Sequence, residues 1–151
     1  MLRQRLNDEL KAAMKSRDQR ATSTLRLILA ALKDRDIAAR PRGITDGVDE
    51  TEIIDMLQKM VRQRQESIEL YKKGNRPELV EQEQGEIDMI ERFLPQKMSE
   101  TEQAMAIESV VKELGAASIK DMGKVMAALK ERYAGRMDFA KVGAQVKQKL
   151  G

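Results

Sequence analysis

A proline followed closely by a helix-start pattern is the feature that most constrains this fold. Pro95 comes after a long acidic, helix-forming run at residues 78–92, and cannot continue that helix because it lacks an amide donor and clashes one turn back. Ser99 and Glu102 then form the S-x-x-E pattern of a capping box, with which a new helix begins. A helix stop, a short extended piece and a new cap predict a joint between two helical bodies. An ordinary turn inside one bundle is the alternative.

The composition predicts that both bodies are all-α. Aromatic residues make up only 3% of the 151 residues and charged residues 35%, while only three prolines interrupt the chain. We expect a first domain at residues 1–94 with about four helices. The last two of these are joined by so few residues that they should form a long antiparallel hairpin. The second domain, residues 95–151, should be a small three-helix bundle.

Apolar residues recur at helical spacing in both domains and predict which faces are buried. The first helix carries an apolar stripe that ends at Met14, and Leu27 widens the apolar face of the second helix. We therefore expect the second helix to be the most buried of the first domain. In the fourth helix Glu83 is the polar exception within an otherwise apolar stripe.

The residues that are missing limit the chemistry. The chain has no His and no Cys, which excludes Ser–His or Cys–His nucleophile pairs, the usual zinc sites and a disulfide framework. We therefore predict no catalytic residues, no metal ligands and no cofactor. No apolar run is long enough to span a membrane and the start has no secretory h-region, so we expect no membrane partner and a cytoplasmic location.

Charge is distributed unevenly along the chain. Residues 1–42 carry 11 Lys and Arg against 5 Asp and Glu, whereas residues 43–95 carry 7 against 13. Residues 116–151 again are basic, with 8 against 3. Two basic ends around an acidic middle favour a polyanion partner, with solvated helix faces whose signs happen to segregate as the alternative.

Several segments together resemble the GatB/YqeY family over essentially the whole chain. They are TLRLILAALK at 24–33, MVRQRQESI at 60–68 followed by Tyr71, FLP at 93–95, GKVM at 123–126 and AGRMD at 134–138. In the larger members, which are B subunits of glutamine-dependent amidotransferases that act on misacylated tRNA, similar helical and tail domains are appended to a catalytic cradle. There the tail contacts tRNA.

The resemblance implies a stand-alone protein that has the helical and tail domains without the cradle. Its implied function is that of an accessory protein that binds tRNA or another structured RNA. A helical protein–protein adaptor is the first alternative. Accessory participation in carbon–nitrogen ligase activity, with glutamine as the amido donor, is the second.

The candidate RNA-binding residues lie in the last two helices and the turns before them. They are Lys120, Lys124, Arg132, Gly135, Arg136, Lys141 and Lys147. Lys124 and Arg136 could neutralise phosphates, and Gly135 could allow a close approach of the backbone to them. A helix cap followed by a solvated base is the alternative for Gly135 and Arg136. Met137 departs from the small residue expected in the family at this place.

Overall fold

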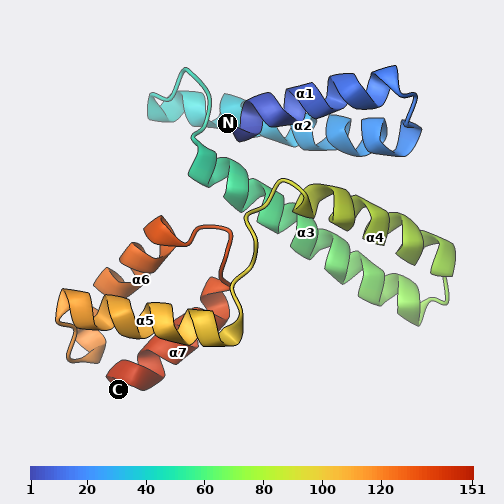
Figure 1. Cartoon of the computed structure of the whole chain (residues 1–151). Coiled ribbons are helices and arrows are strands. Elements are labelled where there is room, and N and C mark those ends of the chain that lie inside the picture. Colours follow the sequence, from blue (N-terminus) through green and yellow to red (C-terminus); the bar gives the residue numbers. More distant parts are fainter. The chain divides into compact units, whose positions relative to one another are not determined.

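The chain is all-helical, which confirms the predicted fold class. The computed structural model describes residues 1–151, with helices α1 to α7, the short 3₁₀ turns η1 and η2, and no strand (Figure 1). By its internal contacts the chain divides into two compact units, an N-terminal unit Met1–Leu94 and a tail unit Pro95–Gly151. Whether the units are separately folding domains stays a prediction.

The N-terminal unit consists of two helical hairpins. Helices α1 (Leu2–Lys15) and α2 (Gln19–Ala39) form the first hairpin, and η1 (Arg40–Arg42) follows α2. Helices α3 (Glu50–Lys73) and α4 (Pro77–Glu91) form the second, and they are the most extensively packed pair of the chain.

The helix starts of this unit are determined locally. The Asp18 carboxylate accepts a hydrogen bond from the amide of Ala21 at the start of α2, and that of Asp49 accepts one from Glu52 at the start of α3. Pro77 occupies the first turn of α4, where its missing amide hydrogen leaves no donor unsatisfied.

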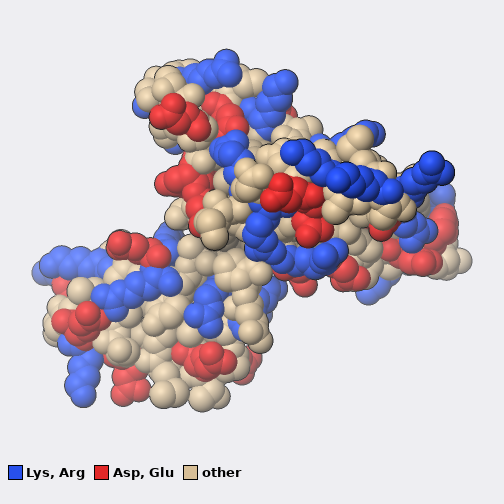
Figure 2. Space-filling model, turned by 45° about the horizontal axis from the view of Figure 1, so that its top comes forward, with Lys and Arg blue, Asp and Glu red and all other residues tan.

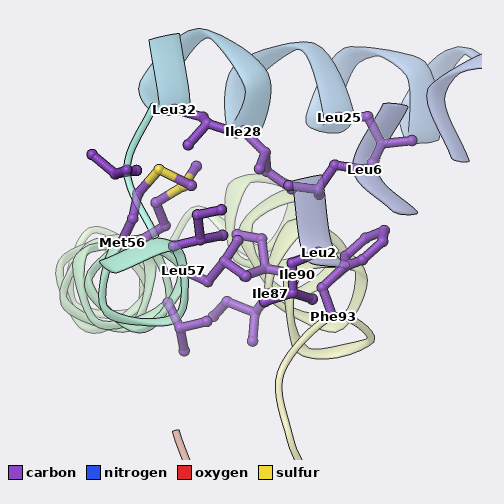
Figure 3. Packing of buried hydrophobic residues seen from close by; sticks show 14 of the residues in the cluster. Leu2, Leu6, Leu25, Ile28, Leu32, Met56, Leu57, Ile87, Ile90 and Phe93 are labelled. Carbon is purple, nitrogen blue, oxygen red and sulfur yellow. The ribbon is translucent and has the colours of Figure 1, made fainter. Parts of the chain in front are cut away.

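The core of the N-terminal unit lies between α2 and the other three helices (Figure 3). Leu25, Ile28 and Leu32 point from α2 towards Leu57 of α3 and Ile90 of α4, and all five are almost completely buried. This arrangement explains the apolar face of α2.

A polar clamp closes the N-terminal unit at the loop before α3. The guanidinium of Arg3 donates to both carboxylate oxygens of Asp36, at 2.8 and 3.0 Å, and also to the carbonyl of Val48. The Asp36 carboxylate in turn accepts a hydrogen bond of 2.9 Å from the amide of Val48. The clamp therefore ties α1, α2 and the loop together. The hydrogen bond from Arg3 lowers the pKa of Asp36.

Two side chains expected in this core lie at the surface. Met14 is 51% exposed and Leu27 is 47% exposed. Met14 is in the last turn of α1, and Leu27 lies on the side of α2 away from the buried Leu25 and Ile28. The apolar stripe of each helix is thus wider than the surface that its neighbours cover.

The tail unit is a three-helix bundle. It consists of α5 (Glu100–Leu114), η2 (Ile119–Asp121), α6 (Met122–Arg132) and α7 (Phe139–Leu150). Its completely buried side chains come from all three helices and are Val110, Val125, Leu129, Val142 and Val146. The predicted capping box is present, because Ser99 accepts from the amide of Glu102 while the Glu102 side chain accepts from the amide of Ser99.

No helix of the protein is both long enough and apolar enough to cross a membrane.

Candidate nucleic-acid interface

Lys120 and Lys124 lie one helical turn apart where η2 continues into α6. Both side chains are exposed, while Met122 and Val125 on the same stretch turn towards the tail core. The alternation follows from helical periodicity, because residues four apart lie on nearly the same side. The structure therefore keeps these two predicted residues together on the outer side of α6.

Gly143, one helical turn before Lys147 on α7, faces the start of α6. Gly143 is so close to α6 that a β-carbon there would be 3.8 Å from Cε of Met126 and 3.9 Å from Cε of Met122. Lys147 follows one turn later, about 40° further round the helix. Because η2 packs against α7 as well as α6, we expect Lys147 to lie near Lys120. We call Lys120, Lys124 and Lys147 the lysine cluster.

Lys141 lies apart from this cluster. It precedes Lys147 by six residues, which places the two about 120° apart round the helix, on opposite flanks of the buried Val142 and Val146. Lys141 is exposed, but it does not extend the surface formed by the other three lysines.

Arg132 is occupied by an ion pair. Its guanidinium donates a short hydrogen bond to the carboxylate of Glu113, which joins α6 to α5. This hydrogen bond lowers the pKa of Glu113. Lys149 similarly lies 3.9 Å from the carboxylate of Glu108 on α5. The members of the lysine cluster take part in no such ion pair.

Gly135 and Arg136 shape the turn between α6 and α7. Gly135 is buried and has a φ of 79°, a left-handed conformation that favours glycine. The guanidinium of Arg136 donates to the carbonyl of Gln96 at 3.1 Å, and its own carbonyl accepts from the amide of Met98 at 2.9 Å. These bonds hold the start of the tail unit against the turn. Met137, the departure from the family pattern, is buried in the tail core.

Two turns of the tail unit involve the protein's own carboxylates. Asp121 accepts hydrogen bonds from the amides of Ala117 and Ser118, which precede η2, and these bonds lower the pKa of Asp121. Asp138 accepts from the amide of Ala140 at the start of α7, so a phosphate at that helix end would compete with it. No side chain caps the start of α6.

The basic side chains of the N-terminal unit also differ in whether they form ion pairs. Arg64 donates to Glu86 at 3.0 Å in a mostly buried ion pair, whereas Arg26 and Arg62 are exposed and form no ion pair. Figure 2 shows basic and acidic side chains mixed over the surface of the face in view. A binding surface for a polyanion must therefore be a local group of cations.

The basic side chains of the tail unit can provide positive charge and hydrogen-bond donors to a ligand. No group of three or more His, Cys, Asp or Glu side chains is positioned to hold a metal ion. Among the acidic side chains, burial raises the pKa of Glu83, and the neighbouring charge of Glu86 raises it further. Glu83 lies on α4 of the N-terminal unit, however, and is not one of the candidate residues of the tail unit.

Comparison with known proteins defines the class to which this helical chain belongs. The model of the family described as "Yqey-like protein" matches residues 3–150. The chain therefore belongs to the YqeY-like protein family.

Among its relatives are fungal proteins named "Altered inheritance of mitochondria protein 41, mitochondrial". The one from Saccharomyces cerevisiae is 31% identical over 134 residues, which cover 89% of this chain and 69% of the yeast protein. The one from Lachancea thermotolerans is 34% identical over 111 residues, or 72% of this chain and 57% of the relative.

The expected cytoplasmic location is wrong, because these relatives are named as mitochondrial proteins and point to the mitochondrion instead. The expectation used the absence of a membrane-spanning apolar run and of a secretory h-region. Neither feature distinguishes the cytoplasm from an organelle.

Proposed function

We propose that this protein is an accessory factor that binds tRNA or another structured RNA through the lysine cluster of its tail unit. The observation that carries the proposal is that the exposed, unpaired Lys120 and Lys124 lie one helical turn apart on a stretch that packs against the helix of Lys147, whereas Arg132 and Lys149 are paired with carboxylates of α5. Unpaired lysines can neutralise phosphates without first breaking an internal ion pair.

The scarcity of aromatic side chains indicates how the RNA would be bound. The chain has two Phe, two Tyr and no Trp, and Phe93 is buried in the N-terminal core. It therefore lacks the exposed row of aromatic rings on which single-stranded bases stack. Contacts from lysine to phosphate carry no base information, so we expect recognition of the RNA backbone and shape rather than of sequence.

The accessory role rests on the resemblance to the helical and tail domains of amidotransferase B subunits. In this proposal the tail binds the RNA and another protein supplies any chemistry, amide transfer included. The protein alone should show no glutaminase or amidotransferase turnover, because the sequence presents no constellation of a nucleophile with an activating base.

The test compares two double variants of the full chain. Lys120→Ala/Lys124→Ala should weaken the binding of a tRNA transcript and lower the log–log salt slope by about one to two, since each lost phosphate contact removes about 0.7 to 0.9. Lys130→Ala/Lys141→Ala is the matched control, because it removes the same charge from exposed, unpaired lysines outside the cluster.

Fluorescence anisotropy between about 50 and 200 mM salt measures both quantities. Equal slopes for the wild type and the cluster variant would refute the proposal. Equal losses in both variants would show that only net charge matters and that the cluster has no special role.

A further inference from the structure

A second surface, on the N-terminal unit, has the form of a binding site and does not involve the lysine cluster. An open hollow of about 700 Å³ lies beside the turn between α1 and α2. Its apolar part consists of Met14 and Leu27, which are two of the large hydrophobic side chains exposed in this unit. Thr22 lines it between them, and Arg17 and Arg26 provide its charge. We call it the basic hollow.

The two arginines of the hollow are available to a ligand. Neither takes part in an ion pair, in contrast to Arg35, which pairs with Asp55, and Arg64, which pairs with Glu86. The nearest carboxylate in the sequence, Asp18, accepts a hydrogen bond from the amide of Ala21 as the cap of α2 and forms no ion pair with either arginine. No ion pair therefore has to be broken before a carboxylate of a ligand reaches the two arginines.

The backbone at Arg17 allows a clean substitution test. Arg17 has a φ of 58°, in the left-handed region that glycine or asparagine adopts more readily. It follows the end of α1, where the amide of Asp18 bonds back to the carbonyl of Ala13, as at a common type of helix end. A glycine at this place would keep the turn while removing the guanidinium.

We propose that the basic hollow binds an acidic amphipathic helix of a partner protein. Carboxylates of such a helix complement Arg17 and Arg26, and its projecting apolar side chains would cover Met14 and Leu27. RNA phosphates would satisfy the arginines but leave both apolar side chains in water. An anionic membrane is the other surface that presents both negative charge and apolar groups, and the vesicle experiment below tests it.

The probe is a synthetic 18-residue helical peptide with leucine at i, i+3, i+7 and glutamate on its flanks. We expect it to bind the full chain with a Kd of the order of 10 to 100 µM, typical of a small interface. Amide chemical-shift changes should concentrate at residues 14–27. A peptide with lysine for glutamate, and one with alanine for leucine, should each bind at least about tenfold more weakly.

Variants of the protein separate binding from folding. Arg17→Gly should retain or increase the melting temperature, because glycine suits the left-handed turn, yet weaken peptide binding about three- to tenfold. Arg26→Ala should act similarly on binding. Arg62→Ala is the control, because it removes an exposed, unpaired arginine from α3 of the same unit and should leave peptide affinity unchanged.

The other outcomes contradict the proposal. If the alanine-for-leucine peptide binds as tightly as the original peptide, the surface is a simple anion site. Chemical-shift changes outside residues 14–27 would place the peptide elsewhere. If phosphatidylglycerol vesicles or a 20-nucleotide RNA bind through Arg17 while the acidic peptide does not, the occupant is a membrane or RNA. tRNA affinity should be the same in Arg17→Gly and in the wild type, which separates this surface from the lysine cluster.

Discussion

Removal of the Asp36 carboxylate should destabilise the N-terminal unit more than removal of any exposed carboxylate. In Asp36→Ala, Arg3 loses two hydrogen bonds and the amide of the buried Val48 loses its acceptor. A hydrogen bond to a charged group contributes about 1.5 to 3 kcal/mol, and an orphaned buried amide costs about 1 to 3 kcal/mol.

Solvent screening makes the expected loss of stability smaller than the sum of these two contributions. The side chain of Asp36 is 22% exposed and that of Arg3 is 37% exposed, so the pair is only partly shielded from water. We therefore expect a loss of about 2 to 3 kcal/mol in the free energy of unfolding. Glu69→Ala is the control, because Glu69 and Lys72 form a largely exposed ion pair at 4.0 Å, and its loss should cost less than about 0.5 kcal/mol.

Urea titration can isolate the N-terminal unit, because each unit contains one tyrosine and the chain has no tryptophan. In a Tyr133→Phe background the fluorescence of Tyr71 reports on the N-terminal unit alone. A loss below about 0.5 kcal/mol in Asp36→Ala would refute the reasoning that the clamp carries this stability.

The pH dependence gives a second test with a definite sign. The pKa of Asp36 is lowered by folding from its ordinary value of 3.8, so its contribution is present above that value and is lost as the pH falls. The difference between wild type and Asp36→Ala should therefore shrink below about pH 4. A difference that stays constant down to pH 3 would contradict the assignment of this contribution to the ionised carboxylate.

Three further predictions concern other parts of the chain. Folding raises the pKa of Glu83 above 4.5, so wild-type stability falls as the pH rises from 4.5 through the pKa of the folded state. Glu83→Gln should therefore be more stable than the wild type at pH 8, and urea titration should show this difference vanish near pH 4. Ser99→Ala removes a capping-box side chain and should cost the tail unit about 1 kcal/mol, measured by Tyr133 fluorescence in a Tyr71→Phe background; no change would show that the cap is dispensable. Limited proteolysis should cut first at residues 95–98 and release a helical tail fragment by circular dichroism, whereas equally fast cuts inside the tail helices would contradict two separately folding domains.

The helix boundaries were predictable because local chemistry determines them. Asp49, Ser99 and Asp138 each accept a hydrogen bond from an amide two or three residues later, and such a cap depends on a single turn of chain. The alternation of exposed Lys120 and Lys124 with buried Val125 was equally visible, since it follows from the helical period.

Features that depend on distant residues were not predictable. Arg3 and Asp36 are 33 residues apart, and Arg132 is 19 residues from Glu113, so neither pair has a local sequence signal. The exposure of Leu27 depends on which helices cover α2, and apolar periodicity does not specify this.

Arg136 illustrates the consequence for the candidate site. The sequence suggested Lys124 and Arg136 as residues that neutralise phosphates. The structure shows that Arg136 bonds to the carbonyl of Gln96, across the start of the tail unit. Replacing Arg136 would remove this hydrogen bond as well as the positive charge. Lys120→Ala/Lys124→Ala is therefore the cleaner test, because it changes only the charge.

Protection of individual lysines by RNA tests the central claim most directly. Acetylation of the unmodified full chain, with and without a tRNA transcript, can be measured at each lysine by mass spectrometry. Lys120, Lys124 and Lys147 should react several-fold more slowly in the presence of tRNA, while Lys130 and Lys141 serve as internal references and should react at unchanged rates. Unchanged reactivity of the three cluster lysines, or stronger protection of Lys130 and Lys141, would contradict the proposal that the tail unit binds RNA through this cluster.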